Sequence, residues 1–307
     1  MELYVDLATE ILKYFKRDID QVQYSRLLKY AKMDANGSSS VGDNHKKAAD
    51  LLRVFISYDN RHISLVSRKV YISDKLKNQL LNEYKNYELV VQQIVNRLRD
   101  GQDVNDRLST KLSDVLYEDG MLNDWRMYHF HLGKRRVDNY CERTGALLIG
   151  FIPLRNHDIY LLEIIPNHSD NIVFANKEYV EIIHHNWPNV IKYARIHGMP
   201  MGPELTIQQR FNLRKNGVNT ADIIDGEAYF GPGLGVTSAG TSVAVQLKVD
   251  MIYNWVGINT IRLRQVLSAF TPSQIPEWLD YKLKLDDKMR RFIIQTNRGE
   301  QVMWHKY

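Results

Sequence analysis

The part of this sequence that is richest in groups able to do chemistry begins with two histidines one residue apart. His129 and His131 alternate with Tyr128 and Phe130, and a basic turn follows at residues 134–136. Alternate side chains of a strand share a face, so we expect both imidazoles on one face and the aromatic rings on the other. An imidazole gives or takes a proton near neutral pH, whereas arginine holds phosphate in a rigid bidentate fork.

These groups are the ingredients of RNA cleavage without a metal. A base would activate the ribose 2′-hydroxyl, an acid would protonate the leaving oxygen, and cations would stabilise the phosphorane. No cofactor is expected for this reaction. The catalytic residues expected on this basis are Tyr128, His129, His131, Arg136 and Arg143, and the residues expected to bind nucleic acid are Lys134, Arg135, Arg210, Arg214 and Lys215.

Other interpretations of these residues stay open. Two imidazoles on the outer face of a sheet, next to a basic turn, are also typical of a solvated or interdomain surface, and the basic helix is equally typical of a solvated face. A His-x-His strand can also supply two metal ligands, which would need a third such as His157, Glu163 or His168. The sequence does not fix that third ligand, so a metal-dependent hydrolase remains an alternative.

A second candidate site is the glycine-rich turn over residues 231–240, which precedes a predicted helix. Free N–H groups and the helix dipole at such a turn attract anions. The spacing is neither that of a Walker A loop nor Gly-x-Gly-x-x-Gly, so a tight turn with Thr241 or Ser242 as helix cap is the competing interpretation. The residues of the predicted anion-binding loop are Gly233, Gly235, Ser238 and Thr241.

His184 and His185 are neighbours on a predicted helix shortly before Pro188. Consecutive side chains of a helix point about 100° apart, so we expect that they do not both face one site. One is expected to pack beside Trp187 and the other to be exposed. The single cysteine, Cys141, lies beside Tyr140 without a group that would activate it.

The elements that must position these residues follow from periodicity. The first 125 or so residues are predicted to be mostly helical, with a flexible loop over residues 35–44 and a helix of about 26 residues between Ser73 and Gly101. Residues 127–132, 146–152 and 159–165 are predicted to be three strands of one antiparallel sheet. A helix over 178–193 with a break at Pro188 follows them.

The last third begins near Gly198. It is predicted to hold a basic helix over 207–215, a strand pair over 221–230, a helix from about Ser242 to Trp255 and a C-terminal hairpin around residues 297–299. The fold class is therefore α+β, with three regions: a helical N-terminal region (1–122), an antiparallel sheet plus helix (123–200) and a C-terminal α+β unit (201–307).

Composition limits the classes of protein to which the chain can belong. With 307 residues, 44% hydrophobic and 25% charged, it has the average composition of a globular protein. No run approaches the roughly 18 apolar residues of a membrane span, and the N-terminal stretch lacks the basic start of a signal peptide. One cysteine fits a reducing compartment, so we expect a cytoplasmic protein that does not contact membranes. The net charge of +5 is too mild to identify a partner by itself.

From Trp125 to about Tyr193 the order of elements resembles the small sheet of the RelE and HigB group of bacterial toxins: a strand ending in basic residues, two further strands and a helix. The resemblance covers less than a quarter of the chain, and residues 167–170 replace the run of lysines usual in the group. It implies a ribosome-dependent mRNA endonuclease that works without metal. The positions that match by type and placement are Tyr128, His129, His131, Lys134, Arg136 and Arg143.

The sequence thus favours a bacterial or phage-related toxin or antiphage defence effector that cleaves RNA, with RNA or the ribosome as its partner. The alternative from another class is a non-catalytic interaction or regulatory subunit. In that case the N-terminal helices would pair with a protein partner and the basic sheet face would dock an acidic one.

Overall fold

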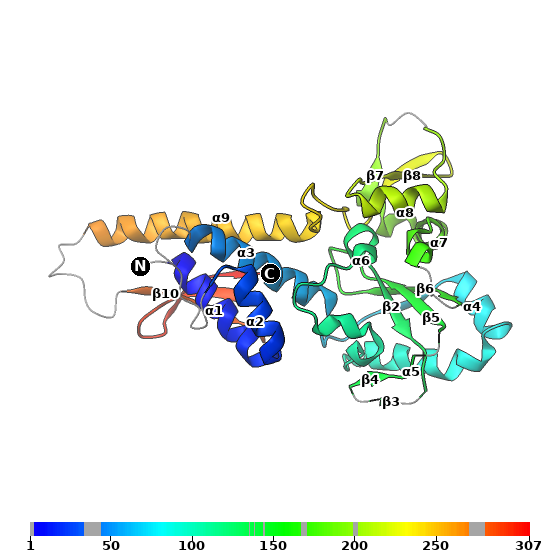
Figure 1. Ribbon diagram of the computed structural model, residues 1–307, viewed down its shortest axis with the longest axis horizontal. Coiled ribbons are helices and arrows are strands. Elements are labelled where there is room, and N and C mark those ends of the chain that lie inside the picture. Colours follow the sequence, from blue (N-terminus) through cyan, green and yellow to red (C-terminus); the bar gives the residue numbers. More distant parts are fainter. Residues whose placement is uncertain are drawn as a thin grey trace. The chain divides into compact units, whose positions relative to one another are not determined.

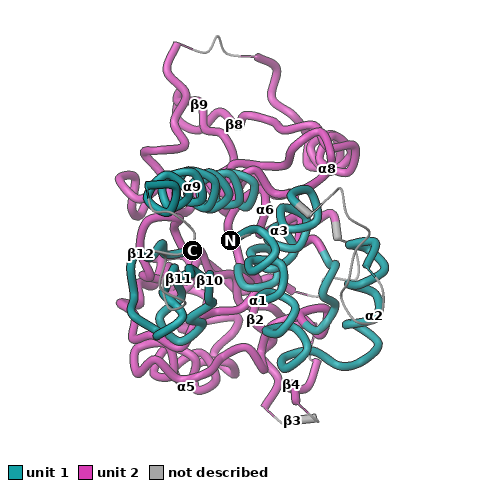
Figure 2. Tube along the Cα trace, turned by 90° about the vertical axis from the view of Figure 1, so that its left-hand side faces the viewer, with its two compact units in different colours: residues 1–60, 113–117, 245–307 teal, residues 61–112, 118–244 magenta. Residues whose placement is uncertain are grey.

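The computed structural model describes most of the chain in two compact units (Figure 2). Unit 1 comprises residues 1–60, 113–117 and 245–307, and unit 2 comprises residues 61–112 and 118–244. The three consecutive regions expected from the sequence stay a prediction. Of the loop predicted over residues 35–44, residues 35–43 lie outside the described residues, which are 3–33, 44–134, 136–137, 139–143, 145–166, 171–198, 202–269 and 280–307.

Helices and strands occupy separate stretches in both units, which confirms the α+β class (Figure 1). Unit 1 packs its helices around a three-stranded antiparallel sheet in the order β10-β11-β12. The aromatic rings of Phe15, Phe55 and Phe292 lie at the centre of its core. Its elements are α1 (Leu3–Asp18), α2 (Gln21–Tyr30), α3 (Asn44–Arg61), α9 (Val243–Ser268), β10 (Tyr281–Asp286), β11 (Arg291–Thr296) and β12 (Gln301–Lys306).

The C-terminal hairpin is confirmed as β11 and β12, but the sequence prediction missed the third strand, β10. Two carboxylates of α1 bind this edge strand. Asp6 accepts from the backbone N–H of Leu283 at 3.1 Å, and Glu10 accepts from that of Leu285 at 3.3 Å. Edge strands expose unpaired backbone donors, so these side chains complete the hydrogen bonding of β10.

The helix predicted to end near Trp255 continues to Ser268 as α9. Gly257 lies inside this helix, and a Cβ there would be only 2.6 Å from the hydroxyl of Tyr4. Beyond this glycine, Leu263 is 3% exposed and packs into the same core as Ile252, so tertiary contacts carry the helix onward.

The single helix of about 26 residues predicted between Ser73 and Gly101 is wrong. The chain forms α4 (Asp74–Leu81), a 3₁₀ turn η1 (Lys85–Tyr87) and α5 (Glu88–Arg99). Asn82 leaves helical geometry with φ −120° and ψ −102°, and its side chain donates to the Asn78 carbonyl at 2.9 Å. Asparagine competes with helix in this way. The predicted start and stop are confirmed, because Ser73 caps α4 and Gly101 takes φ +69° after α5.

Unit 2 is built on a four-stranded sheet in the order β1-β6-β5-β2. The three predicted strands are confirmed and are antiparallel to one another, and β1 adds a parallel pair that the sequence did not reveal. One face of the sheet packs against α5, and the other packs against α7. The strands are β1 (Val70–Ile72), β2 (Met127–His131), β5 (Leu147–Phe151) and β6 (Ile159–Ile165).

A smaller sheet in the order β7-β9-β8 lies C-terminal to α7 in the chain. The predicted strand pair is confirmed as β8 and β9. Its two-residue turn is Asp225-Gly226, with φ of +49° and +78°, the geometry that an Asp-Gly turn favours. The remaining elements are η2 (Asn105–Arg107), η3 (Thr110–Ser113), α6 (Gly120–Trp125), β3 (Arg136–Val137), β4 (Tyr140–Cys141), η4 (Asn171–Ala175), α7 (Glu178–Asn186), η5 (Pro188–Val190), η6 (Lys192–Ala194), β7 (Arg195–Ile196), α8 (Ile207–Lys215), β8 (Ala221–Ile224) and β9 (Glu227–Phe230).

Among the described residues, no helix has both the length and the apolar composition that crossing a bilayer requires.

Candidate functional site

The histidine pair of β2 lies against the sheet core. As predicted, Tyr128 and Phe130 pack on one face, while the histidines alternate with them along the strand. His131 is only 5% exposed. His129 is half-buried, and its ring stacks on Phe174 with centroids 5.2 Å apart and an interplanar angle of 26°. A substrate would have to displace packed side chains to reach His131.

Among the described basic residues near β2, Arg107 and Arg143 both bind backbone carbonyls, and Arg107 donates to that of His131 at 3.2 Å. The guanidinium of Arg143 donates to the Leu108 carbonyl at 3.0 Å and lies over the Tyr140 ring. Lys134 is exposed in the turn after β2. Arg135, the Arg136 side chain and His168 lie outside the described residues, so their predicted roles stay predictions. Glu163, one candidate for a third metal ligand, forms an ion pair with Lys75 at 2.6 Å.

The two arginines of α8 form ion pairs inside the protein. Arg210 is 2% exposed and donates to Asp222 Oδ1 at 2.8 Å. Burial raises the pKa of the Asp222 carboxyl, and Arg210 opposes that rise. Arg214 pairs with Asp124 and lies over the Trp125 ring at 5.0 Å. Lys215 is exposed and is therefore the member of the predicted set on α8 that is placed to meet a phosphate.

The glycine-rich segment packs against the end of α6. The amide of Gly233 donates to the Asp124 carbonyl at 2.8 Å, and that of Gly235 donates to the Asn123 carbonyl at 3.1 Å. A Cβ on Gly233 would lie 2.5 Å from the Asn123 oxygen, so this close approach requires glycine. Ser238 is exposed, and the Thr241 hydroxyl lies 2.9 Å from that of Thr237. The amides of the two predicted glycines are thus used within the protein.

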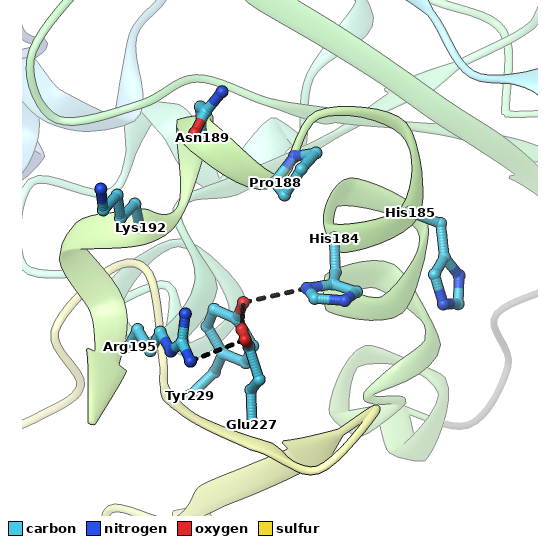
Figure 3. A pocket seen from close by; sticks show the side chains of 8 residues that line it. All are labelled: His184, His185, Pro188, Asn189, Lys192, Arg195, Glu227 and Tyr229. Atoms are coloured by element: carbon cyan, nitrogen blue, oxygen red, sulfur yellow. Dashed lines mark hydrogen bonds and ion pairs between the residues drawn. The ribbon is translucent and has the colours of Figure 1, made fainter. Parts of the chain in front are cut away.

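A pocket of about 460 Å³ opens where α7 meets the smaller sheet (Figure 3). Its volume is that of a small-ligand site. The segment after Pro188 and the edge strand β7 bring two cationic side chains, Lys192 and Arg195, to one wall. The residues that line the pocket are His184, His185, Pro188, Asn189, Lys192, Arg195, Glu227 and Tyr229.

A continuous hydrogen-bonded chain crosses this pocket. Tyr229 donates its hydroxyl proton to Glu227 Oε2 at 2.7 Å, and the same hydroxyl oxygen lies 2.9 Å from His184 Nδ1. Because the hydroxyl has one proton, His184 must carry its proton on Nδ1 and donate it to Tyr229. Arg195 Nη2 binds the other oxygen of Glu227 at 2.7 Å (Figure 3).

Burial, followed by the bond to Glu227, raises the pKa of Tyr229 to about 12. The phenol therefore stays neutral over the pH range in which most enzymes work, and its hydroxyl proton stays directed at Glu227. Nε2 of His184 is left as the basic nitrogen of a neutral imidazole. The imidazole is 15% exposed and so is largely fixed in place by its surroundings.

The expectation that His184 and His185 do not serve one site is wrong. His185 Nε2 lies 2.9 Å and His184 Nε2 lies 3.4 Å from the same oxygen of Asp225. The side chains leave α7 in different directions, but the β8–β9 turn places Asp225 between their rings. Trp187 packs on Tyr71 and Tyr160. His185 is 58% exposed, so the expectation of one exposed histidine is confirmed.

The pocket combines groups for two tasks. His184 can accept a proton at Nε2, and Asp225 can then stabilise the imidazolium that forms. Lys192 and Arg195 supply positive charge for an anion. The ligand atoms of His184, His185 and Asp225 also lie within 4.8 Å of one another, a spacing that a metal ion could bridge. The hydrogen bond between His185 Nε2 and Asp225 at 2.9 Å accounts for the closeness of that pair without an ion.

Lys192, Arg195, Glu227 and Tyr229 were missed by reasoning from the sequence. Lys192 and Arg195 lie on two short neighbouring elements, and Glu227 and Tyr229 lie on a hairpin more than 30 residues further along the chain. No local motif therefore joins the two pairs. One signal was present: the Asp-Gly turn between two short apolar runs predicts a hairpin that would place its aspartate at a tip.

Comparisons with protein-family models, with curated proteins and with solved structures found no match to this chain.

Proposed function

We propose that this chain cleaves RNA by acid–base catalysis without a metal and that the active site is the His184 pocket. The proposal also assigns the chain to the bacterial or phage-related toxin or defence effectors of the cytoplasm. It rests on one observation: the bond from His184 Nδ1 to the Tyr229 hydroxyl leaves Nε2 as the basic nitrogen of a histidine that lines the same pocket as two cationic side chains.

The reaction would begin at the ribose next to the scissile phosphate. His184 Nε2 takes the proton of the 2′-hydroxyl, and the oxygen attacks the adjacent phosphorus. The bond from phosphorus to the 5′ oxygen then breaks. That oxygen takes a proton from the Lys192 ammonium, since a guanidinium does not give up its proton in proteins. The products are a 2′,3′-cyclic phosphate and a 5′-hydroxyl.

Arg195 stabilises the negative charge that develops on the phosphorane. Its guanidinium is held at 2.7 Å by Glu227, which fixes the direction of the remaining N–H groups. Oriented donors stabilise the charge that develops on a phosphorane more than mobile ones do. Asp225, 3.4 Å from His184 Nε2, stabilises the imidazolium after proton transfer.

The test uses purified protein and a labelled single-stranded RNA in the presence of EDTA, with and without ribosomes. We expect cleavage in EDTA, fragments with cyclic phosphate ends, and no cleavage of the same sequence made of deoxynucleotides. Cleavage only after a divalent metal is added would favour a metal-dependent hydrolase. Intact RNA under all of these conditions would contradict the proposal and favour a non-catalytic interaction protein.

A further inference from the structure

Helix α9 presents apolar side chains on the side opposite its core face. Its inner side packs Val249, Ile252 and Val256, each at most 1% exposed, into unit 1. A helix on a protein surface normally carries polar residues outside. Five apolar side chains of α9 are nevertheless between 49% and 60% exposed: Leu247, Met251, Ile258, Ile261 and Val266.

Four of these residues follow a heptad repeat. Leu247, Met251, Ile258 and Ile261 fall on the first and fourth heptad positions, and Asn254 and Gln265 fill the two remaining ones. The steps along this stripe are alternately four and three residues. That spacing of 3.5 residues is the one by which two helices pack along a shared seam. We refer to these six positions as the outer stripe.

We propose that the outer stripe of α9 pairs with the outer stripe of a second copy of this chain, in antiparallel orientation, to form a dimer with two-fold symmetry. The proposal is independent of the RNA-cleaving function.

The register follows from the stripe itself. In an antiparallel pair, first positions face fourth positions, and a two-fold axis near Val256 satisfies this rule along the whole stripe. Met251 then faces Ile261 of the partner subunit, and Asn254 faces Ile258 of the partner subunit. Two-fold pairing uses the same surface on both copies, so each of these contacts occurs twice.

Charge complementarity supports the same orientation. Asp250 and Arg264 both flank the stripe on its same side, so in the antiparallel pair Asp250 lies beside Arg264 of the partner subunit, again twice. Lys248 on the other flank turns toward its own unit, where its ammonium donates to Asn60 at 3.3 Å. A parallel pair would instead place Asn254 against Asn254 of the partner subunit and would bring no opposite charges together.

Length is sufficient for a stable seam. The helix has 26 residues, which is about 39 Å at 1.5 Å per residue. Isolated two-helix seams need three to four heptads, and the six positions of the outer stripe, residues 247–265, make up nearly three. Because unit 1 already holds the helix in shape, no helix formation has to accompany association.

The test measures the mass of the full-length protein by sedimentation at about 10 μM. We expect a dimer for the wild type and a monomer for Met251→Lys. The double variant Met251→Lys with Ile261→Glu should restore the dimer, because antiparallel pairing places each lysine opposite a glutamate. In a parallel pair, residue 251 would meet residue 251 and the double variant would stay monomeric. Leu89→Lys, which changes a residue 70% exposed on α5, serves as the control and should stay dimeric.

A wild-type monomer at about 100 μM would overturn the proposal, as would a dimer that survives Met251→Lys. A double variant that remains monomeric while its circular dichroism matches the wild type would overturn the antiparallel register. RNA cleavage is not used in any of these measurements, so their outcome is separate from that of the proposed function.

Discussion

The hydroxyl of Tyr229 accepts a hydrogen bond from Nδ1 of His184 at 2.9 Å while donating its own proton to Glu227 at 2.7 Å. This relationship fixes which nitrogen of the imidazole is basic. A third group that orients a base in this way is a recurring feature of acid–base sites.

Replacement of Tyr229 by phenylalanine should lower the rate of RNA cleavage by about 10- to 100-fold. The ring contacts remain, but the acceptor that holds the proton on Nδ1 is lost. Single-turnover cleavage measures the effect, and the melting temperature should change little. Tyr30→Phe, at a site 43% exposed in the other unit, should leave the rate unchanged. An unchanged cleavage rate in Tyr229→Phe would contradict the claim that this hydroxyl orients the imidazole of His184.

The pH dependence of stability should report the same tyrosine. The pKa of Tyr229 is raised from 10.0 to about 12 by burial and by Glu227, so its neutral form is favoured in the folded state. The resulting stabilisation is complete below pH 10 and is lost as the pH rises to 12. Denaturant unfolding at pH 9 and at pH 12 measures the free energy of unfolding of the wild type and of Tyr229→Phe. Between these two pH values, the wild type should lose more unfolding free energy than the variant does. A difference independent of pH would contradict the raised pKa.

Alanine substitutions of Arg210 and Lys215 should have different effects, because Arg210 stabilises the fold whereas Lys215 is exposed on α8. Arg210→Ala would leave the buried Asp222 carboxylate without its partner and should cost about 3 kcal/mol of unfolding free energy. Lys215→Ala, at an exposed site, should cost less than about 0.5 kcal/mol and should instead weaken RNA binding. Urea denaturation and a filter-binding assay measure the two quantities. Stable Arg210→Ala protein with weakened RNA binding would show that the arginine serves as a phosphate contact after all.

Two glycines of the glycine-rich segment should respond differently to alanine. In Gly233→Ala the new Cβ would meet the backbone oxygens of Asn123 and Leu122 at 2.5 and 2.7 Å, so we expect a loss of about 3 kcal/mol. Gly240 has φ +76° with open space around it, so alanine there should cost only about 1 kcal/mol. Thermal unfolding of both variants provides the comparison. Equal losses would contradict the close packing of Gly233 on α6.

The sequence predicted best where one local rule decides the structure. The three long strands of unit 2, the cap at Ser73, the break at Pro188 and the helix over residues 207–215 follow from apolar spacing and from the chemistry of serine, proline and glycine. The break at Asn82 did not follow, because asparagine is tolerated in many helices and the surrounding contacts decide its geometry. Strand β10 was missed because the residues that complete its hydrogen bonding lie on α1, more than 270 positions away.

The candidate site could be predicted from the sequence only in part. The spacing of His129 and His131 predicted that both imidazoles share one face of a strand. That face is itself covered by other side chains, so His131 is buried. Consecutive side chains of a helix point about 100° apart, and His184 and His185 do leave α7 in different directions. Helix geometry alone does not predict that the tip of the β8–β9 hairpin reaches between them. Sites assembled from distant short elements depend on tertiary packing, which single-sequence patterns do not contain.

The most direct test of the central claim is the cleavage rate of His184→Ala in EDTA, with and without added imidazole. If His184 is the base, the variant should cleave RNA at least about 100-fold more slowly than the wild type while keeping its melting temperature, and free imidazole should restore part of the rate. His197→Ala, which removes an exposed histidine of the same unit, should match the wild type. Wild-type cleavage by a folded His184→Ala protein would contradict the assignment of the active site to this pocket.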